Sequence, residues 1–208
     1  MQLSPFGGGI IEQIPILLKM IFSEIREINP SQVLLIPFAR EVYEPDSPWH
    51  EKWFQEYVGS FKSNVEFLDA RNDSDRKKAN VPMIYLSGGS TKQNLINTIN
   101  SSSELQNLIN NAKYIIAESS GAMVLGDYSR SFGEDSEIIK GLGILKDTII
   151  EPHYFEKSRK SLLLNKIRTY NCSIGIGIDS NSGIRINTET GTDVLTPLGN
   201  GKYEIIMN

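Results

Sequence analysis

The strongest chemical signal in the chain is the segment Glu118-Ser119-Ser120-Gly121-Ala122-Met123. It follows an apolar run at residues 114–117 that predicts a buried strand, and it leads into small residues compatible with a helix. A strand, a tight Ser-Gly turn and a helix together expose a serine hydroxyl at a sheet edge, above a helix N-terminus. We therefore interpret Ser119 as the candidate nucleophile of a serine hydrolase.

A serine nucleophile needs backbone amides that hold the oxyanion formed when it attacks a carbonyl carbon. The amide of Ser120, the next residue, is one natural donor. The pair Gly88-Gly89 ends an apolar run at residues 83–87 and is a source of the second donor. Glycines let the backbone approach a ligand closely, and ligands of α/β sheets bind where the strands end. A tight strand-to-helix turn that binds nothing is the alternative for this pair.

The chain has two histidines that might serve as general base. His153 follows Pro152, which ends an apolar run, and strand ends are where catalytic histidines are held. His50 lies in an early segment, around residues 48–58, that we interpret as an amphipathic helix with a surface or half-buried histidine. We therefore choose His153, with a purely structural histidine as the alternative.

A triad also needs an acid that fixes the imidazole tautomer and stabilises its charged form. The polar segment 127–140 contains several carboxylates, and we expect it to be a loop over one end of the sheet. The candidates within it are Asp127, Glu134, Asp135 and Glu137. Most of them must be solvated loop charges, so the residues alone leave the acid open.

The pattern of apolar runs predicts an α/β fold. Short, continuous apolar strands separated by helices indicate a parallel sheet covered on both faces. We expect strands at residues 32–37, 65–68, 83–87 and 114–117, helices around 48–58, 91–98 and 103–110, and a C-terminal β-meander at 183–186, 192–195 and 202–206. The length of 208 residues fits one domain that spans residues 1–208.

Composition excludes several classes of protein. A net charge of −4 does not suggest nucleic-acid binding, and the single cysteine, Cys172, agrees with a reducing compartment. The start resembles no signal peptide, and the apolar stretch 14–22 is too short to span a membrane. We expect a cytoplasmic protein.

Two histidines and one cysteine, far apart, lack the spacing of a zinc site. The run Gly7-Gly8-Gly9 lacks the spacing of a dinucleotide fingerprint, so we interpret it as a turn after a short first strand.

Four segments, in order, resemble the serine peptidase family that includes dipeptidase E and cyanophycinase. Residues 85–91 resemble the family's G-G-N-T oxyanion segment, and residues 119–122 its S-A-G-A elbow. Residues 151–154 are similar to its histidine segment, and residues 175–179 to its late G-I-G-I-D strand. The resemblance spans about residues 31–208 and implies the flavodoxin-like fold of class I glutamine amidotransferases, with helices on both faces of a mainly parallel sheet.

The resemblance also implies an activity, the hydrolysis of short peptides. Dipeptidase E cleaves after an N-terminal aspartate, and cyanophycinase cleaves β-linked aspartyl-arginine units. By the same resemblance Ser119 is the nucleophile and His153 the base, while Gly89 and Ser120 donate backbone amides, with Gly88 beside them. The implied ligand is a small peptide, with no cofactor and no metal.

The family acid lies about fifteen residues after the serine, and the resemblance therefore gives Glu134, with the neighbouring Asp135 as the alternative. The arginine that binds aspartate in dipeptidase E follows the histidine segment. Arg159 lies in that region and is a candidate substrate-binding residue, but it does not align at that position. Aspartate specificity therefore stays open.

Two residues of the elbow depart from the family pattern, and the elbow itself does not distinguish amide from ester substrates. Glu118 puts a charge beside the elbow, and Ser120 stands where the family has alanine. An esterase or amidase of the same fold, or a binding protein that kept the fold without catalysis, are the alternatives. A glutamine amidotransferase is disfavoured because the elbow holds serine. A homodimer is compatible with the sequence, which does not determine the oligomeric state.

Overall fold

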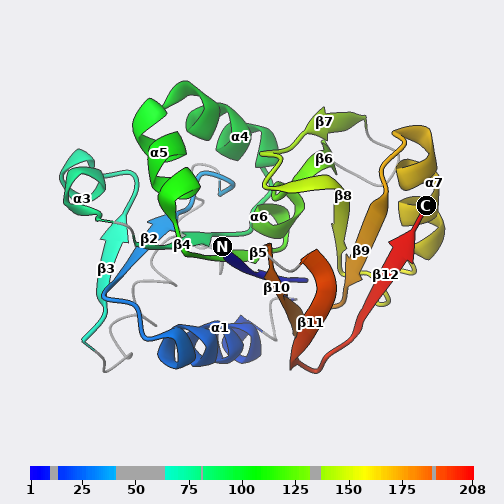
Figure 1. Cartoon of the computed structure of the whole chain (residues 1–208), viewed down its shortest axis with the longest axis horizontal. Helices are drawn as coiled ribbons and strands as arrows, with labels where there is room; N and C mark the ends of the chain where they lie inside the picture. The colour runs from blue at the N-terminus through cyan, green and yellow to red at the C-terminus, as the bar shows by residue number, and fades with distance from the viewer. Residues whose placement is uncertain (10–13, 41–63, 81, 132–136, 189–190) are drawn as a thin grey trace.

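A computed structural model of the protein describes residues 1–9, 14–40, 64–80, 82–131, 137–188 and 191–208 (Figure 1). Within these ranges the chain forms an α/β fold whose strands are divided between two sheets. The larger sheet has the strand order β11-β10-β1-β5-β4-β2-β3. Its strands are β1 (Gln2–Phe6), β2 (Gln32–Ile36), β3 (Glu66–Asp69), β4 (Met83–Leu86), β5 (Tyr114–Glu118), β10 (Ser182–Asn187) and β11 (Gly191–Gly199).

Parallel strands form the centre of each sheet. In the larger sheet β1, β5, β4, β2 and β3 run parallel, and β10 and β11 add an antiparallel edge. The smaller sheet has the order β12-β9-β8-β6-β7, in which β6, β8 and β9 are parallel. Its strands are β6 (Gly126–Arg130), β7 (Ile138–Lys140), β8 (Leu145–Pro152), β9 (Ile174–Ile178) and β12 (Tyr203–Met207).

Helices cover both faces of the larger sheet, and another helix flanks the smaller one (Figure 1). Helix α1 lies against one face of the larger sheet, whereas α4 and α5 lie against the other. Helix α7 packs beside β8 and β9. The helices are α1 (Ile14–Ile28), α3 (Asp73–Lys78), α4 (Lys92–Ser101), α5 (Ser103–Asn111), α6 (Ser120–Met123) and α7 (Lys160–Thr169). Among the described residues, no helix is long and apolar enough to cross a membrane.

The side chains of β2 show why a continuous apolar run becomes a central strand. Val33 and Leu35 pack in the same cluster as the buried side chains of α1, whereas Leu34 and Ile36 pack in the cluster that contains α4 and α5. Successive side chains of a strand point to opposite faces, so a strand covered on both sides must be apolar at every position. The prediction of an α/β fold with covered parallel strands is confirmed.

Most of the expected elements are present. The strands predicted from apolar runs correspond to β2, β3, β4 and β5, and two of the predicted helices correspond to α4 and α5. Ser102 caps α5, because its hydroxyl accepts the Leu105 N–H at 3.2 Å. The helix expected around residues 48–58, with His50, lies outside the described residues.

Two expectations about local structure were wrong. The polar segment 127–140 is not simply a loop, because β6 and β7 at its ends pair as an antiparallel ladder, with Tyr128 opposite Lys140. The C-terminal strands do not form one continuous meander. Strands β10 and β11 pair with each other at the edge of the larger sheet, but β12 leaves them and pairs with β9 of the smaller sheet. The parallel strands of the smaller sheet thus have an antiparallel neighbour on both sides, whereas, among the described residues, those of the larger sheet have one only beside β1 and end at the parallel strand β3.

The two sheets meet where β1 ends. The Gly7 N–H donates to the Ser182 carbonyl at 3.0 Å, and the Gly7 carbonyl accepts the His153 N–H at 3.3 Å. The Tyr154 N–H in turn donates to the Ile178 carbonyl at 3.3 Å, at the end of β9. These bonds gather the carboxyl ends of strands from both sheets, the region where ligands of parallel α/β sheets bind.

Candidate active site

Ser119 occupies a strained turn between β5 and α6. Its backbone has φ 47° and ψ −113°, a left-handed conformation that is rare for a residue with a side chain. The Ser119 N–H donates to the Phe6 carbonyl at 2.9 Å, and this bond fixes the turn against β1. A Cβ on Gly121 would lie 2.3 Å from the Leu86 carbonyl oxygen, so the turn needs glycine there. This geometry is that of a nucleophile elbow.

His153 follows the last residue of β8 and also has a positive φ, of 51°. A Cβ placed on Gly8 would lie 2.9 Å from the Cβ of Ser119 and 3.1 Å from Nε2 of His153. The serine and the imidazole nitrogen therefore flank the same glycine, which has φ +88°. The candidate nucleophile and the candidate base are brought together in space across the bare backbone of Gly8.

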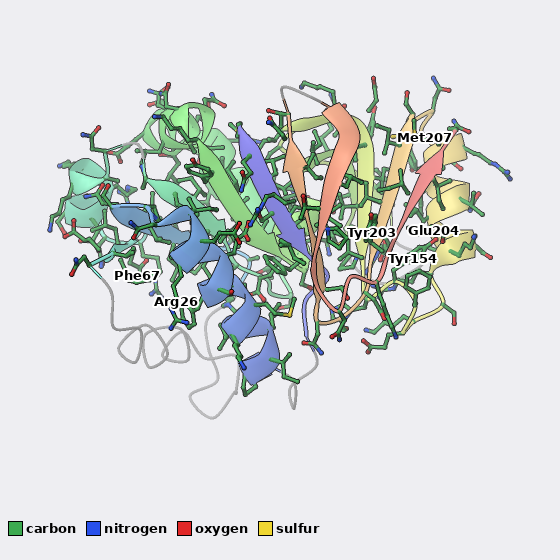
Figure 2. All side chains as sticks on the ribbon, turned by 60° about the horizontal axis from the view of Figure 1, so that its bottom comes forward. Arg26, Phe67, Tyr154, Tyr203, Glu204 and Met207 are labelled. Carbon is green, nitrogen blue, oxygen red and sulfur yellow. The ribbon has the colours of Figure 1, made fainter. Side chains whose placement is uncertain are left out.

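The residue after His153 anchors the histidine segment to the smaller sheet. Tyr154 is buried, and its hydroxyl donates to Glu204 of β12 at 2.8 Å. Figure 2 shows Tyr154 next to Glu204 at this edge of the molecule. A Cβ on Gly177 would lie 2.4 Å from the Tyr154 ring, so the ring packs directly on the bare backbone of β9. The late glycine-rich strand thus holds the histidine in place.

The second imidazole nitrogen of His153 contacts a hydroxyl rather than a carboxylate. Nδ1 lies 2.8 Å from Oγ of Ser180, and 3.6 Å from Oε2 of Glu156. The Ser180 hydroxyl donates to Glu156 in a short hydrogen bond. Since that hydroxyl has a single proton and gives it to Glu156, its oxygen accepts from Nδ1–H. This arrangement leaves Nε2, on the side of Ser119, without a proton and ready to accept one.

Burial lowers the pKa of the His153 imidazole below its usual value, and the charge of Lys157 lowers it further. The Glu156 carboxylate opposes both effects in part. Hydrogen bonding from Ser180 in turn lowers the pKa of Glu156. At neutral pH the site therefore contains an uncharged imidazole with an ionised carboxylate behind it, the states that a general base and its supporting acid require.

The candidate oxyanion turn lies against the elbow. A Cβ on Gly88 would lie 3.1 Å from the Cβ of Ser119. The Gly88 N–H, however, already donates to Oε1 of Glu118 at 3.0 Å, so Gly89 is the candidate oxyanion donor of this turn. Gly89 has φ +154°, and a Cβ there would lie 2.1 Å from the Ala39 carbonyl oxygen.

The two neighbouring serines of the elbow have different environments. The Ser120 hydroxyl donates to the Gly89 carbonyl at 2.5 Å, so this side chain connects the elbow to the oxyanion turn. The Ser120 side chain is therefore engaged away from His153. Its backbone N–H lies in the first turn of α6, where helix amides lack partners within the helix.

Arg159 lies close to the site but is heavily engaged. It is 6% exposed, its Nη1 pairs with Oε1 of Glu151 at 2.9 Å, and the same nitrogen donates to the Pro152 carbonyl at 2.7 Å. Arg130 also bonds Glu151, at 3.0 Å. These contacts hold the end of β8 and thereby the residue that follows it, His153. Nearby Lys92 is buried as well, and burial with the charge of Arg130 lowers its pKa to about 8.

The predicted acids Glu134 and Asp135 lie outside the described residues. Of the other carboxylates in their segment, Asp127 of β6 accepts the Asp147 N–H at 2.5 Å and so joins β6 to the start of β8. The described ranges contain no group of three or more His, Cys, Asp or Glu side chains arranged to hold a metal ion.

Sequence reasoning missed Gly8, Ser180 and Glu156 as parts of the site. Gly8 lies in the turn after β1, as expected, but that strand is central and its turn therefore lies between the nucleophile and the base. Ser180 follows β9, the strand next to β8. The rule that neighbouring parallel strands end together would have identified Ser180, had it been applied to the G-I-G-I-D strand.

Comparison with known proteins shows the family of this chain. The model of peptidase family S51 matches residues 8–194. Cyanophycinases from Synechococcus elongatus and Thermosynechococcus vestitus are each 30% identical over 96 residues, which cover 42% of this chain and 29% of theirs. The match therefore spans less than a third of the length of these curated relatives.

Two solved structures have the same fold. A peptidase from an acI-B1 Actinobacterium superposes with a TM-score of 0.69 at 21% identity, over 99% of this chain and 90% of its own. A candidate peptidase E from Listeria monocytogenes EGD-e gives 0.59 at 18% identity, over 94% and 96%. The fold is therefore the α/β fold of these peptidase structures, with a nucleophile elbow between β5 and α6. The chain belongs to peptidase family S51, the serine peptidase family of dipeptidase E and cyanophycinase.

Proposed function

We propose that this protein hydrolyses dipeptides or short peptides, with Ser119 as nucleophile and His153 as general base. The observation that carries the proposal is that both residues lie against Gly8. A Cβ on Gly8 would be 2.9 Å from Cβ of Ser119 and 3.1 Å from Nε2 of His153. The lowered pKa of the imidazole supports the role of base, because an uncharged His153 can accept the serine proton at neutral pH.

The proposed reaction proceeds through an acyl-enzyme. Nε2 of His153 takes the proton of the Ser119 hydroxyl as its oxygen attacks the peptide carbonyl carbon. The resulting oxyanion is held by the N–H groups of Gly89 and Ser120. His153 then gives the proton to the leaving amine, and the C–N bond breaks. A water molecule, deprotonated by the same imidazole, releases the acid product and restores the serine.

Two candidates remain for the group that supports His153. The family resemblance assigns the role to Glu134, or to Asp135. The hydrogen bonds at Nδ1 favour Glu156, acting through Ser180, because a neutral imidazole has one N–H and Ser180 accepts it at 2.8 Å. We propose Glu156 with Ser180 as the support, and Glu134 and Asp135 stay predictions. The carboxylate variants E134Q, D135N and E156Q, compared for kcat, distinguish them.

Dipeptides are the proposed substrates because the four motifs resemble those of dipeptidase E, and a structural neighbour is a candidate peptidase E. The similarity to cyanophycinases makes β-linked aspartyl-arginine units a second candidate. The Arg159 guanidinium already pairs with Glu151 and donates to the Pro152 carbonyl. We therefore propose that Arg159 supports substrate binding indirectly, by holding the end of β8. Cytoplasmic location and a homodimer stay predictions.

The test is hydrolysis of a library of dipeptides and of β-aspartyl-arginine by wild type, S119A and S120A. We expect S119A to lose activity by roughly 10⁴-fold or more, as removal of a triad nucleophile does elsewhere. S120A is the comparison for the neighbouring serine. It removes the hydrogen bond to the Gly89 carbonyl but keeps the Ser120 amide, so it should retain far more activity than S119A. Equal activity of wild type and S119A overturns the proposal, and loss in S120A alone moves the nucleophile to Ser120.

The same panel separates the alternative functions. Turnover of simple esters without turnover of any peptide would favour an esterase of the same fold. Failure of Ser119 in the folded protein to react with a fluorophosphonate would favour a binding protein without catalysis.

A further inference from the structure

The carboxylate immediately before the nucleophile is buried and paired. Glu118 ends β5, and its Oε1 lies 2.8 Å from Nη2 of Arg40, a residue that follows β2. The two side chains are 2% and 4% exposed. A charged pair in this position is unexpected, because β5 is otherwise an apolar strand of the central sheet.

The same carboxylate oxygen also holds the candidate oxyanion turn. Oε1 of Glu118 accepts the Gly88 N–H at 3.0 Å. A Cβ on Gly88 would lie 3.5 Å from Cδ of Glu118, so the turn lies against the carboxylate. One oxygen atom thus joins the end of β5, the turn after β4 and the segment after β2.

The segment that contains Arg40 is itself fastened to that turn. The Thr91 N–H and its hydroxyl both donate to the Ala39 carbonyl, at 2.9 Å and 2.7 Å. Gly89 lies directly against the same carbonyl, since a Cβ there would be 2.1 Å away. The position of the Gly89 amide relative to Ser119 is therefore set by contacts that converge on Glu118 and its partner.

Stability alone does not account for the pair. Taking two charges out of water is expensive, and well-packed apolar side chains of similar volume are often as stable. A carboxylate one residue from the nucleophile also has an electrostatic consequence. Unpaired, its negative charge would oppose the negative charge that develops on the substrate oxygen, and a cation at 2.8 Å offsets that repulsion.

We propose that Glu118 and Arg40 are positioning residues for the oxyanion hole. Glu118 occupies the Gly88 N–H and thereby orients the turn so that the Gly89 N–H faces the substrate carbonyl, while Arg40 neutralises and orients Glu118. The inference rests on the proposed function, because it assigns a role in the reaction of Ser119. Neither residue touches the reacting atoms.

The two partners are not equivalent in this arrangement. Removal of Arg40 leaves a buried carboxylate beside the developing oxyanion, whereas E118Q keeps an oxygen that can accept the Gly88 N–H and removes the negative charge. The variant R40M should therefore lose more activity than E118Q. In the double variant E118Q/R40M, part of the loss caused by R40M should be recovered, because the uncompensated charge is gone.

The experiment measures kcat and KM on the best peptide, the rate of Ser119 phosphonylation by a fluorophosphonate, and the melting temperature. We expect R40M to lower kcat and the phosphonylation rate by about 10²-fold, with KM changed by less than about threefold, as for the loss of an oxyanion donor. The control is E24Q, which breaks the buried pair of Glu24 with Arg185, 2.6 Å apart and with a carboxylate side chain also 2% exposed. E24Q should lower the melting temperature and leave kcat and the phosphonylation rate near wild type.

Lower melting temperatures for E118Q and R40M with unchanged kcat and phosphonylation rates, the pattern of E24Q, overturn the inference. The inference is also overturned if the fold-loss of kcat in the double variant equals the product of the two single fold-losses. If R40M does not fold, the neutral polar variant R40Q, alone and with E118Q, makes the same comparison. If the wild type does not hydrolyse peptides but is still phosphonylated at Ser119, only the proposed substrate is overturned. The phosphonylation rates of the variants then test the roles of Glu118 and Arg40.

Discussion

Nδ1 of His153 lies 2.8 Å from Oγ of Ser180, and the Ser180 hydroxyl donates in turn to the Glu156 carboxylate. Nδ1 of His153 also lies 3.6 Å from Oε2 of Glu156, and the Ser180 hydroxyl contacts both groups. A hydroxyl in this place fixes the tautomer by accepting Nδ1–H. It also connects His153, which follows β8, to Ser180, which lies in the segment after β9.

We therefore expect S180A to reduce kcat strongly. Without the hydroxyl, Nδ1–H loses its acceptor and the proton is free to move to Nε2, where it blocks the general base. The expected loss is on the order of a hundredfold, the scale of a general-base contribution. S182A is the matched control, because the Ser182 hydroxyl bonds backbone groups, accepting the Lys202 N–H at 3.2 Å and donating to the Ser180 carbonyl at 3.5 Å. Wild-type kcat in S180A, with E134Q inactive, would return the supporting role to Glu134.

Gly8 leads to a second prediction. A methyl group there would begin 2.9 Å from the Cβ of Ser119 and 3.1 Å from Nε2 of His153. G8A should separate the nucleophile from the base and abolish most activity, and the positive φ should cost about 1–2 kcal/mol of stability. Activity and melting temperature are measured together. G9A is the control, since its Cβ would meet nothing closer than 3.5 Å. Full activity in a folded G8A would contradict the proposed contact between Ser119 and His153.

Some of the residues in these predictions were identified as candidates from the sequence, and others were not. Ser119, the Gly88-Gly89 turn and His153 were chosen as candidates because each follows a recognisable apolar run, and parallel strands end at a common edge. Gly8 and Ser180 follow β1 and β9, and they contribute through neighbours distant in sequence. Local pattern cannot reveal a role that arises only when two strands become adjacent.

The fold shows the same division between local and tertiary information. Strands that are apolar throughout, such as β2 and β4, were predicted from their sequences alone. Strand β6 was missed because it carries polar residues, among them Arg130, whose charge is compensated by Glu151 of β8. The departure of β12 from its expected neighbours was missed because pairing with β9 is decided by the open edge of another sheet.

The pH dependence of kcat/KM provides a third prediction. Because burial lowers the pKa of His153 from its usual 6.5, activity should rise with pH along a limb that lies below that value. K157Q removes a charge that lowers this pKa, so the limb should move to higher pH. E156Q removes a charge that raises it, so the limb should move to lower pH. K113Q, at the amino end of β5 and exposed, is the control that should move nothing. Identical limbs in all three variants would exclude His153 as the titrating group.

Lys92 gives the last prediction, which concerns stability. Burial and the nearby charges of Arg130 and Arg159 lower its pKa to about 8, below the value of about 10.4 expected when the chain is unfolded. Below pH 8 the amine is protonated in both states and its burial is unfavourable. Between pH 8 and 10 the unfolded chain binds more protons than the folded one, so the stability contributed by this group rises with pH.

K92M should therefore be more stable than wild type at pH 7, and its advantage should shrink as the pH approaches 10. Urea unfolding of wild type and K92M at several pH values measures the difference, with the exposed Lys113 replaced in K113M as the control. A constant difference across this range would mean that the Lys92 amine titrates alike in the folded and unfolded chain. A difference that grows with pH would mean that the folded state favours the charged amine, through a carboxylate that binds it more strongly than Glu151 does.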